Sequence, residues 1–215
     1  MKQKIELMLF DLDGTLVDSE IDIVNSANYL RKFSGYEELD SKTILCYVGD
    51  GLPFLIERLL PDFTKDQLQE SIKIFQEHYH QHCVDHTKAY PGVVETLEYF
   101  HFLPKVVISN KPRHACGLIL QNLDLTKHFT KILGGDSMSK KKPDPMPLLA
   151  VLNELDISAS QTVMVGDGTV DIEAGKNAGT MTCAVTYGMR SQQQLAPLKP
   201  SHMINHFSKL QILFH

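Results

Sequence analysis

Short apolar runs alternate with longer segments of helical periodicity along most of the chain. The run Leu7–Phe10 has the right length for a strand that is buried on both faces. Similar runs recur later, at Lys105–Ile108, Ile132–Leu133, Thr162–Val165, Met181–Val185 and Met203–Ile204. Most segments between these runs place apolar residues at helical spacing. This alternation favours an α/β fold class, with a parallel sheet and helices on both faces.

One long segment lacks this alternation. From Leu16 to about residue 85, apolar residues recur at helical intervals and no strand pattern is present. Ser19 and Thr64 are suitable N-caps for two of its helices. We therefore predict an all-helical insert over residues 16–85, within an α/β core made of residues 1–15 and 86–215.

Two carboxylates follow the first predicted strand. Asp11 and Asp13 are two residues apart, so in an extended chain both side chains would face one site. Close carboxylates repel each other, and a divalent cation would remove that conflict. Mg²⁺ is the expected cofactor, because it prefers carboxylate and water oxygens. The alternative is a strand that ends in an ordinary Asp-Gly turn at Gly14.

The ends of two later strands carry further polar residues. Ser109 and Asn110 follow one of them, and Asp167 follows the other, with Asp171 one helical turn later. Lys142 lies in the loop between these two groups. Functional groups of parallel sheets gather beyond the carboxyl ends of the strands, so we expect these side chains to meet there.

Such a set fits phosphoryl transfer. Ser109 and Lys142 would hold phosphoryl oxygens, whose charge the site must stabilise. Asp11 is the candidate nucleophile, since an aspartate can form an acyl-phosphate. Asp13 would donate a proton to the leaving alcohol and then activate water. A loop serine and a solvated basic loop around Lys142 are the plain alternatives.

Composition narrows the range of partners. The chain has 215 residues, a formal net charge of -5 and a pI of about 6.0, and a nucleic-acid binder would usually be more basic. Its four cysteines form no CxxC pair, which favours a reducing compartment. No segment is long enough to span a bilayer. We therefore expect a cytoplasmic monomer or homodimer with a small phosphorylated ligand, and neither nucleic acid nor membrane as a partner.

Four motifs in this order resemble those of the haloacid dehalogenase superfamily of phosphohydrolases. They are DLDGT at Asp11–Thr15, SN at Ser109–Asn110, KP at Lys142–Pro143 and GDxxxD at Gly166–Asp171. The resemblance covers the whole chain. It implies a Rossmann-like core, Mg²⁺ and an aspartyl-phosphate intermediate. The second aspartate of the first motif favours phosphatase chemistry, since dehalogenases proper lack it.

The same resemblance assigns roles to single residues. It implies that Asp11 is both nucleophile and metal ligand, and that Asp13 is the acid/base and offers its backbone carbonyl to the metal. Asp167 would be the third metal ligand from the protein. Asp171 would order the metal's water shell or the lysine. We also place Thr15 and Asn110 among the substrate-binding residues.

The helical insert occupies the position of a superfamily cap domain, which closes over small substrates. The segment from Tyr47 to Gly51, together with Arg58, resembles the cap of bacterial phosphoglycolate phosphatases. This likeness implies 2-phosphoglycolate as substrate, with Gly49 and Arg58 binding it. A helix–helix turn and a surface arginine are the plain alternatives. Two residues depart from the expected pattern: Val170 replaces a polar residue, and Asp50 would repel an anion.

Other activities of the same superfamily stay open, namely a phosphosugar phosphatase or mutase, a pyrophosphatase and a nucleotidase. A non-catalytic binding module on this fold is a more remote alternative, because Asp11, Asp13 and Asp167 are all present. Four histidines, His78, His80, His82 and His86, form a cluster in the sequence. We favour ordinary exposed helix histidines over a transition-metal site, because no third ligand in metal geometry is indicated.

Overall fold

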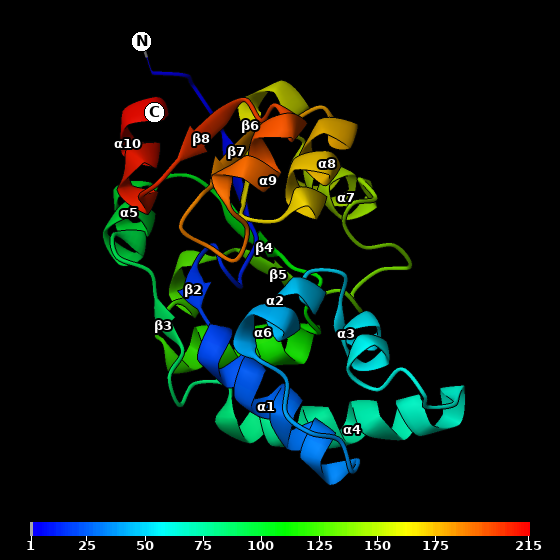
Figure 1. Ribbon diagram of the computed structural model, residues 1–215. Coiled ribbons are helices and arrows are strands. Elements are labelled where there is room, and N and C mark those ends of the chain that lie inside the picture. Colours follow the sequence, from blue (N-terminus) through cyan, green and yellow to red (C-terminus); the bar gives the residue numbers. More distant parts are fainter. Residues whose placement is uncertain (1) are drawn as a thin grey trace.

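The computed structural model describes residues 2–215 and is built on a parallel sheet of six strands (Figure 1). In spatial order they are β5 (Lys131–Leu133), β4 (Lys105–Ile108), β1 (Leu7–Phe10), β6 (Thr162–Gly166), β7 (Met181–Val185) and β8 (His202–Ile204). Each strand overlaps an apolar run that predicts it, so the predicted α/β fold class is confirmed. β1 lies inside the sheet, hydrogen-bonded to β4 and β6.

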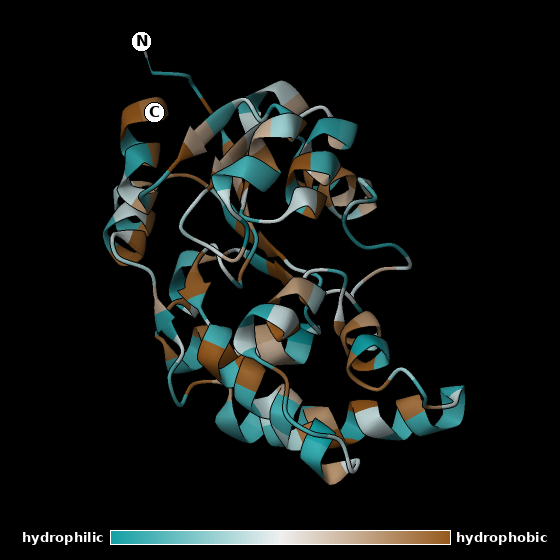
Figure 2. Ribbon diagram, viewed as in Figure 1, coloured by the Kyte–Doolittle hydropathy of each residue, from teal (hydrophilic) through white to brown (hydrophobic). Residues whose placement is uncertain are grey.

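Helices cover both faces of the sheet, and the side chains of β1 alternate between them. Met8 and Phe10 pack with α5 (Val93–Tyr99), α6 (Arg113–Asn122) and α10 (Leu210–Leu213). Leu7 and Leu9 pack with α7 (Met146–Leu155) and α8 (Thr169–Ala178). The strands appear as apolar segments between more polar helices in Figure 2. All four residues of β1 are buried, so the strand has no place for a polar side chain. Asp11, directly after the strand, is therefore the first polar residue at its carboxyl end.

Shorter elements complete the core. They are α9 (Gln192–Leu195) and the 3-10 turns η1 (Thr126–His128), η2 (Ala159–Gln161), η3 (Ala196–Leu198) and η4 (Phe207–Lys209). α9 buries Leu195 against Ile172 and Ala184, at the side of the sheet where β7 and β8 lie.

The helical cap follows β1 in the sequence, as predicted. It contains α1 (Glu20–Phe33), α2 (Ser41–Tyr47), α3 (Leu52–Leu59) and α4 (Lys65–His82). In Figure 1 the cap lies at the lower end of the molecule, with α1 and α4 side by side. Thr64 caps α4 through a reciprocal bond pair with Gln67, as its position predicts. The cap's apolar residues join those of one sheet face in a single cluster.

Two details differ from the sequence prediction. Two short strands, β2 (Val17–Asp18) and β3 (Lys88–Ala89), pair as an antiparallel ribbon that links cap and core. A two-residue strand is too short to show period-two alternation, so no strand pattern was visible there. Ser19 stands at the N-cap of α1, but its side chain makes no capping bond. The division at residues 15/16 and 85/86 stays a prediction, with the ribbon close to both points.

A buried carboxylate fastens the start of the cap to the segment that returns to the core. Asp22 on α1 is 1% exposed and accepts hydrogen bonds from the backbone N–H groups of His86 and Thr87. The Thr87 hydroxyl also donates to it, at 2.7 Å, and His86 Nδ1 lies 2.9 Å away. Burial alone would raise the pKa of Asp22, but these hydrogen bonds outweigh it and leave the pKa below its ordinary value.

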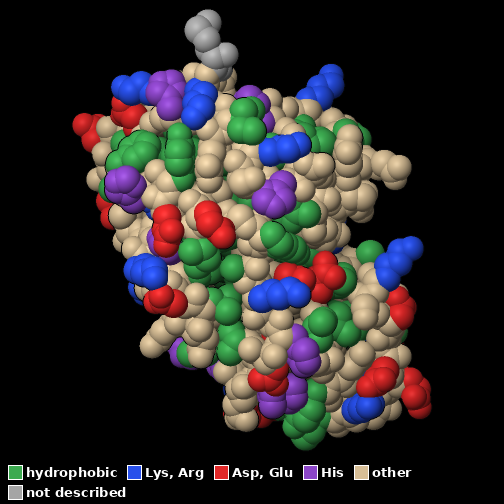
Figure 3. Space-filling view, turned by 90° about the vertical axis from the view of Figure 1, so that its left-hand side faces the viewer, with side chains coloured by type: hydrophobic (Ala, Val, Ile, Leu, Met, Phe, Trp, Pro, Cys, Tyr) green, Lys and Arg blue, Asp and Glu red, His purple; other side chains and the backbone are tan. Residues whose placement is uncertain are grey.

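The distribution of charged side chains on the surface agrees with the modest net charge. On the face shown in Figure 3, acidic and basic side chains are interspersed rather than gathered by sign. Among residues 2–215, no helix combines the length and the apolar character that a bilayer crossing requires.

Candidate active site

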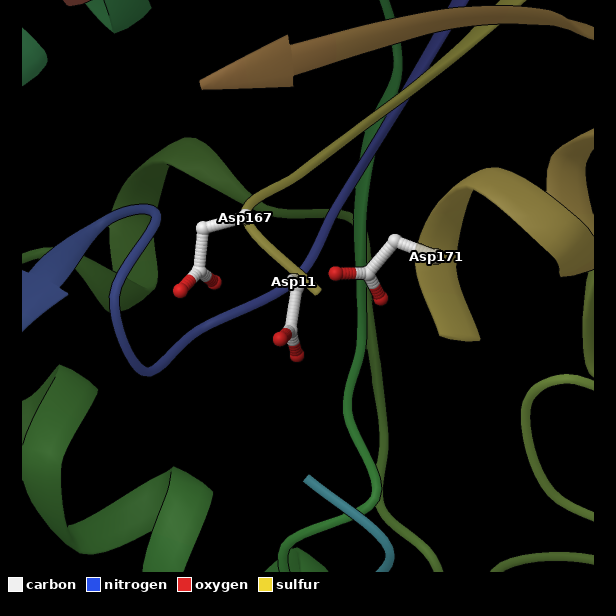
Figure 4. Close-up of side chains that lie close together, drawn as sticks. All are labelled: Asp11, Asp167 and Asp171. Atoms are coloured by element: carbon white, nitrogen blue, oxygen red, sulfur yellow. The ribbon is translucent and has the colours of Figure 1, made fainter. Parts of the chain in front are cut away.

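Three adjacent strands end at the same edge of the sheet and bring the predicted polar residues together. Phe10, the last residue of β1, is in register with Val107 of β4 and Val165 of β6. The residues that follow these strands therefore emerge side by side. Asp11 follows β1 and Asp167 follows β6, and in Figure 4 their carboxylates point toward the same space as that of Asp171 on α8.

Asp11, Asp167 and Asp171 form a compact carboxylate group. One oxygen from each lies within 4.8 Å of those of the others. Burial, together with the charges of Asp11 and Asp171, raises the pKa of Asp167 to about 8. Among residues 2–215, Asp11 Oδ1 and Asp171 Oδ1 share one partner, the Lys142 ammonium, so three carboxylates at this spacing face a single positive charge. This excess of carboxylate oxygens fits a hard divalent cation, so the residues present suit the implied Mg²⁺.

Lys142 is the one cation that touches this group among the described residues. Its ammonium lies 3.0 Å from Asp11 Oδ1 and 2.6 Å from Asp171 Oδ1, and its side chain is 1% exposed. Burial alone would lower the pKa of Lys142, but the charges of Asp11 and Asp171 raise it above its ordinary value. The lysine therefore stays charged. The basic-loop alternative is wrong for Lys142, whereas its neighbour Lys140 is exposed.

Residues that follow β1 and β7 hold Asp167 in place. The Thr15 hydroxyl donates to Asp167 Oδ1 at 3.1 Å and accepts from the Asp167 backbone N–H at 3.0 Å. The Met189 N–H donates to the other carboxylate oxygen at 2.8 Å. Gly14 has φ +76°, and a Cβ there would lie 2.2 Å from Asp167 Oδ2. Glycine is therefore required by both the backbone turn and the close approach.

Asp13 turns away from the carboxylate group and enters a second cluster. Ser19 Oγ donates to its Oδ1 at 2.5 Å, and Lys111 Nζ lies 2.7 Å from its Oδ2. Lys111 also donates to the Tyr79 hydroxyl of cap helix α4, at 2.9 Å. Burial would lower the pKa of Lys111, but Asp13 and Tyr79 raise it, so its charge is retained. Ser19 thus serves Asp13 instead of capping α1.

Sequence reasoning missed Lys111 and Tyr79. Lys111 directly follows the SN motif, which is a weak signal, because a lysine before Pro112 is equally typical of a surface loop. Tyr79 belongs to the apolar stripe of α4, and that stripe predicts only packing. Their meeting depends on the way α4 lies over the core, and no local pattern encodes it.

A cavity of about 120 Å³ lies between the cap and this edge of the sheet. Its walls include both clusters and the cap loop, with Asp11, Asp13, Gly49, Tyr79, Ser109, Asn110, Lys111, Lys142 and Val170 among them. Ser109 and Asn110 are 5% and 7% exposed, so they are buried wall residues rather than open loop residues. The cavity is smaller than those that hold drug-sized ligands. It suits a substrate of a few heavy atoms.

Two predicted binding residues do not line the cavity. Thr15 is fully buried beside Asp167, and Arg58 pairs instead with Asp50, at 2.8 Å between Nη2 and Oδ2. Both side chains of that pair are partly exposed, 39% and 43%. Substrate contact by Thr15 and Arg58 stays a prediction that this arrangement does not favour. Arg58 does compensate the charge of Asp50, which weakens the repulsion expected from that residue.

The cap loop is held against the core by polar contacts. Asn110 Nδ2 donates to the backbone carbonyls of Gly49, at 2.9 Å, and Lys142, at 2.8 Å. Arg190, which follows β7, donates to the carbonyls of Leu45 and Val48, at 3.0 and 2.5 Å. The guanidinium thereby satisfies carbonyls at the end of α2. Arg190 also lines the cavity and is a further residue that the sequence did not single out.

The histidines around α4 have ordinary side-chain partners, and the rings of His78 and His82 pack on each other with centroids 4.5 Å apart. His78 lies 3.0 Å from Ser26 Oγ, His82 lies 2.8 Å from Asp85, and His86 contacts Asp22. Within residues 2–215, the carboxylate group of Asp11 is the one cluster of three or more potential metal ligands. The histidines therefore form no site of three ligands, and the transition-metal hypothesis is wrong for them.

Comparison with known proteins agrees with this geometry. The sequence family of haloacid dehalogenase-like hydrolases matches residues 8–185. The chain belongs to this family. This hydrolase is 38% identical to the phosphoglycolate phosphatase of Chromobacterium violaceum over 191 residues, which cover 86% of each chain. It is also 38% identical to the phosphoglycolate phosphatase of Aquifex aeolicus over 186 residues, again 86% of each chain.

Among solved structures, a predicted phosphoglycolate phosphatase from Haemophilus somnus matches with a TM-score of 0.93 at 27% identity, over 98% of each chain. The protein is therefore a phosphoglycolate phosphatase-like hydrolase with the cap and core of its family. The family resemblance inferred from the four motifs is confirmed.

Proposed function

We propose that this hydrolase is an Mg²⁺-dependent phosphomonoesterase that converts 2-phosphoglycolate to glycolate and phosphate. The observation that carries the proposal is a group of three carboxylates at one edge of the sheet, two of which contact the buried Lys142 ammonium. A small cavity joins them to the cap. The names of the relatives support 2-phosphoglycolate as the substrate. The separation of the site into two charged clusters supports phosphomonoester hydrolysis with separate nucleophile and acid/base.

Asp11 is proposed as the nucleophile. Its carboxylate oxygen would attack phosphorus and form an acyl-phosphate, while the bond from phosphorus to the alcohol oxygen breaks. Asp13 would give the departing oxygen its proton. In the second half, Asp13 would take a proton from water as that water attacks phosphorus, which releases phosphate and regenerates Asp11. Asp13 lines the same cavity as Asp11 but is held by different partners, which suits a separate task.

The remaining residues would position the phosphoryl group. Lys142 and Ser109 line the cavity and would donate to phosphoryl oxygens. Asp11, Asp167 and the Asp13 backbone carbonyl would hold Mg²⁺, and Asp171 would support Lys142 and the ion's water shell. When bound, Mg²⁺ would neutralise carboxylate and phosphoryl charge. Asn110 and Gly49 would contact the substrate from the meeting point of core and cap loop.

Phosphate release tests the proposal. Purified protein with Mg²⁺ is offered a phosphoester panel that contains 2-phosphoglycolate, sugar phosphates, pyrophosphate and nucleotides. We expect 2-phosphoglycolate to be the best substrate. Asp11→Asn should reduce turnover on the order of 10³- to 10⁵-fold, and EDTA should abolish it reversibly. Undiminished turnover by Asp11→Asn would end the nucleophile assignment.

The same assay separates the alternatives within the superfamily. A mutase would return phosphate to its product and release little inorganic phosphate. A binding module would fold and bind Mg²⁺ without turnover on any ester of the panel. A cytoplasmic location and a monomer or homodimer stay predictions.

A further inference from the structure

Lys111 is a buried cation that the reaction outlined above does not use. Its side chain is 10% exposed, and its ammonium lies between core and cap. It contacts both oxygens of Asp13, at 2.7 and 2.9 Å, and the Tyr79 hydroxyl at 2.9 Å. Burying a charge is costly unless the charge is paired. Asp13 pairs with this charge, and the ammonium also lines the cavity, so its role toward a substrate requires an explanation.

The position of Lys111 relative to the phosphoryl site suggests such a role. Lys142 is bound to Asp11 and Asp171, on the phosphoryl side of the cavity. Lys111 is bound to Asp13, the residue that would protonate the leaving oxygen. The two lysines therefore mark two different places for negative charge. A substrate that carries a phosphoryl group at one end and an anion on its leaving group would satisfy both.

Tyr79 supplies a second donor at the same place. Its hydroxyl oxygen accepts from Lys111, and its own proton is donated to no acceptor among residues 2–215. Burial raises the pKa of Tyr79, so the hydroxyl keeps that proton. The ammonium contacts Asp13 through two N–H groups and can turn one of them to a ligand. It and the hydroxyl, which both line the cavity, can then donate to one carboxylate, whose oxygens accept several hydrogen bonds at once.

Other charged side chains near the cavity are engaged by partners within the protein. Arg190 is engaged by the carbonyls of Leu45 and Val48. Asp50, the acidic residue of the cap loop, is paired with Arg58. Asp13 itself is shared between Lys111 and Ser19.

We propose that Lys111 and Tyr79 together bind the carboxylate of the leaving group and so select phosphorylated hydroxy acids over neutral phosphate esters. This inference rests on the proposed function and adds the residues that determine its specificity. Tyr79 comes from the cap, so the carboxylate would be fully bound only with the cap closed on the core. Selection and closure would then depend on the same contact.

The test compares 2-phosphoglycolate with ethyl phosphate, which lacks only the carboxylate. The readout is the ratio of the two kcat/KM values, measured for wild type, Lys111→Met and Tyr79→Phe. We expect the ratio to fall about 10- to 100-fold in Lys111→Met and about 3- to 10-fold in Tyr79→Phe. Tyr79→Phe keeps the buried ring, so it remains informative if Lys111→Met folds poorly. Lys140→Met, which changes an exposed lysine, is the matched control and should keep the wild-type ratio.

The outcomes are distinct. A wild-type preference for 2-phosphoglycolate that persists in both variants, or an equal loss on both esters, would overturn the role of Lys111 and leave the proposed function standing. A wild type that hydrolyses both esters without preference would overturn the substrate assignment and this role with it. Recovery of part of the ratio in Lys111→Arg would support a requirement for charge.

Discussion

The two lysine–carboxylate clusters of the site differ in where their members come from. The first joins Asp11, Lys142 and Asp171, all from the α/β core. The second joins Asp13 and Lys111 of the core to Tyr79 of the cap. Asp11 and Asp13 are two residues apart in the chain, yet each belongs to a different cluster.

The difference separates the chemistry from its selectivity. A cluster made only of core residues needs no cap residue to form, which suits the reacting groups. A cluster that needs a cap residue is complete only when the cap lies on the core, which suits recognition of the part of the substrate that varies. Substitutions in the first cluster should therefore affect every substrate, and those in the second should discriminate among them.

The largest effect is expected from breaking the first cluster with Lys142→Met. Asp11 and Asp171 would lose their buried counter-charge, and removing one partner of a buried ion pair costs about 3–5 kcal/mol of unfolding free energy. Turnover should fall on the order of 10³-fold for every ester, since a phosphoryl ligand is lost as well. Denaturant unfolding without metal and phosphate release measure the two effects. Lys140→Met is the control, and equal behaviour of the two variants would contradict the assignment.

An intermediate effect is expected where the cap is fastened to the core. Asp22→Asn should lower the unfolding free energy at pH 7 by about 1–3 kcal/mol, because the side chain loses charge-assisted hydrogen bonds from His86 and Thr87. The folded-state pKa of Asp22 lies below 3.8, so its contribution is present above that pH and disappears as the pH falls through the folded value. The difference between wild type and variant should therefore narrow below about pH 4.

Denaturant unfolding at pH 7 and pH 3 measures this difference. The exposed Asp85, changed to Asn, is the control and should have little effect at either pH. A gap that widens in acid would show that Asp22 does not hold its charge through these bonds. The comparison of 2-phosphoglycolate with ethyl phosphate on Asp22→Asn would sharpen the contrast, because a loosened cap should weaken the second cluster more than the first.

The smallest effect is expected at the cap loop. Asp50→Asn removes an ion pair with Arg58 that is exposed on both sides. The unfolding free energy should change by less than about 1 kcal/mol. Because Arg58 already compensates the charge of Asp50, KM for 2-phosphoglycolate should decrease by no more than about threefold. A decrease well beyond this would show that Asp50 repels the substrate directly, and steady-state kinetics distinguish the two cases.

Much of the fold follows from local patterns. The strand β1 can be predicted from the sequence, because both its faces are buried and all its residues are therefore apolar. The ribbon of β2 and β3 is not readable, because its two-residue strands are determined by pairing across the whole length of the cap. Two capping residues show the same distinction between local and tertiary partners. Thr64 caps α4 with Gln67, three residues away, as the sequence predicts. Ser19 instead donates to Asp13, which the turn after β1 brings to it.

The sequence by itself determined the parallel sheet, the inserted helical cap and the first cluster. Asp11 directly follows a strand and Asp171 lies in the first turn of a helix, at the edge where a parallel sheet gathers such residues. Lys142 lies in the loop between β5 and α7, where its motif indicates it. Only the tertiary structure decided that Asp13 turns to Lys111, that Thr15 supports Asp167 and that Arg58 compensates Asp50. The first two contacts join residues of the core that are far apart in the chain, and the third joins a loop and a helix of the cap. They depend on how turns and loops are placed in the folded chain, which no local pattern of the sequence specifies. The stretch from Asp11 to Thr15 thus predicts phosphoryl-transfer chemistry, while the proposed binding of the substrate depends on the cap that follows it.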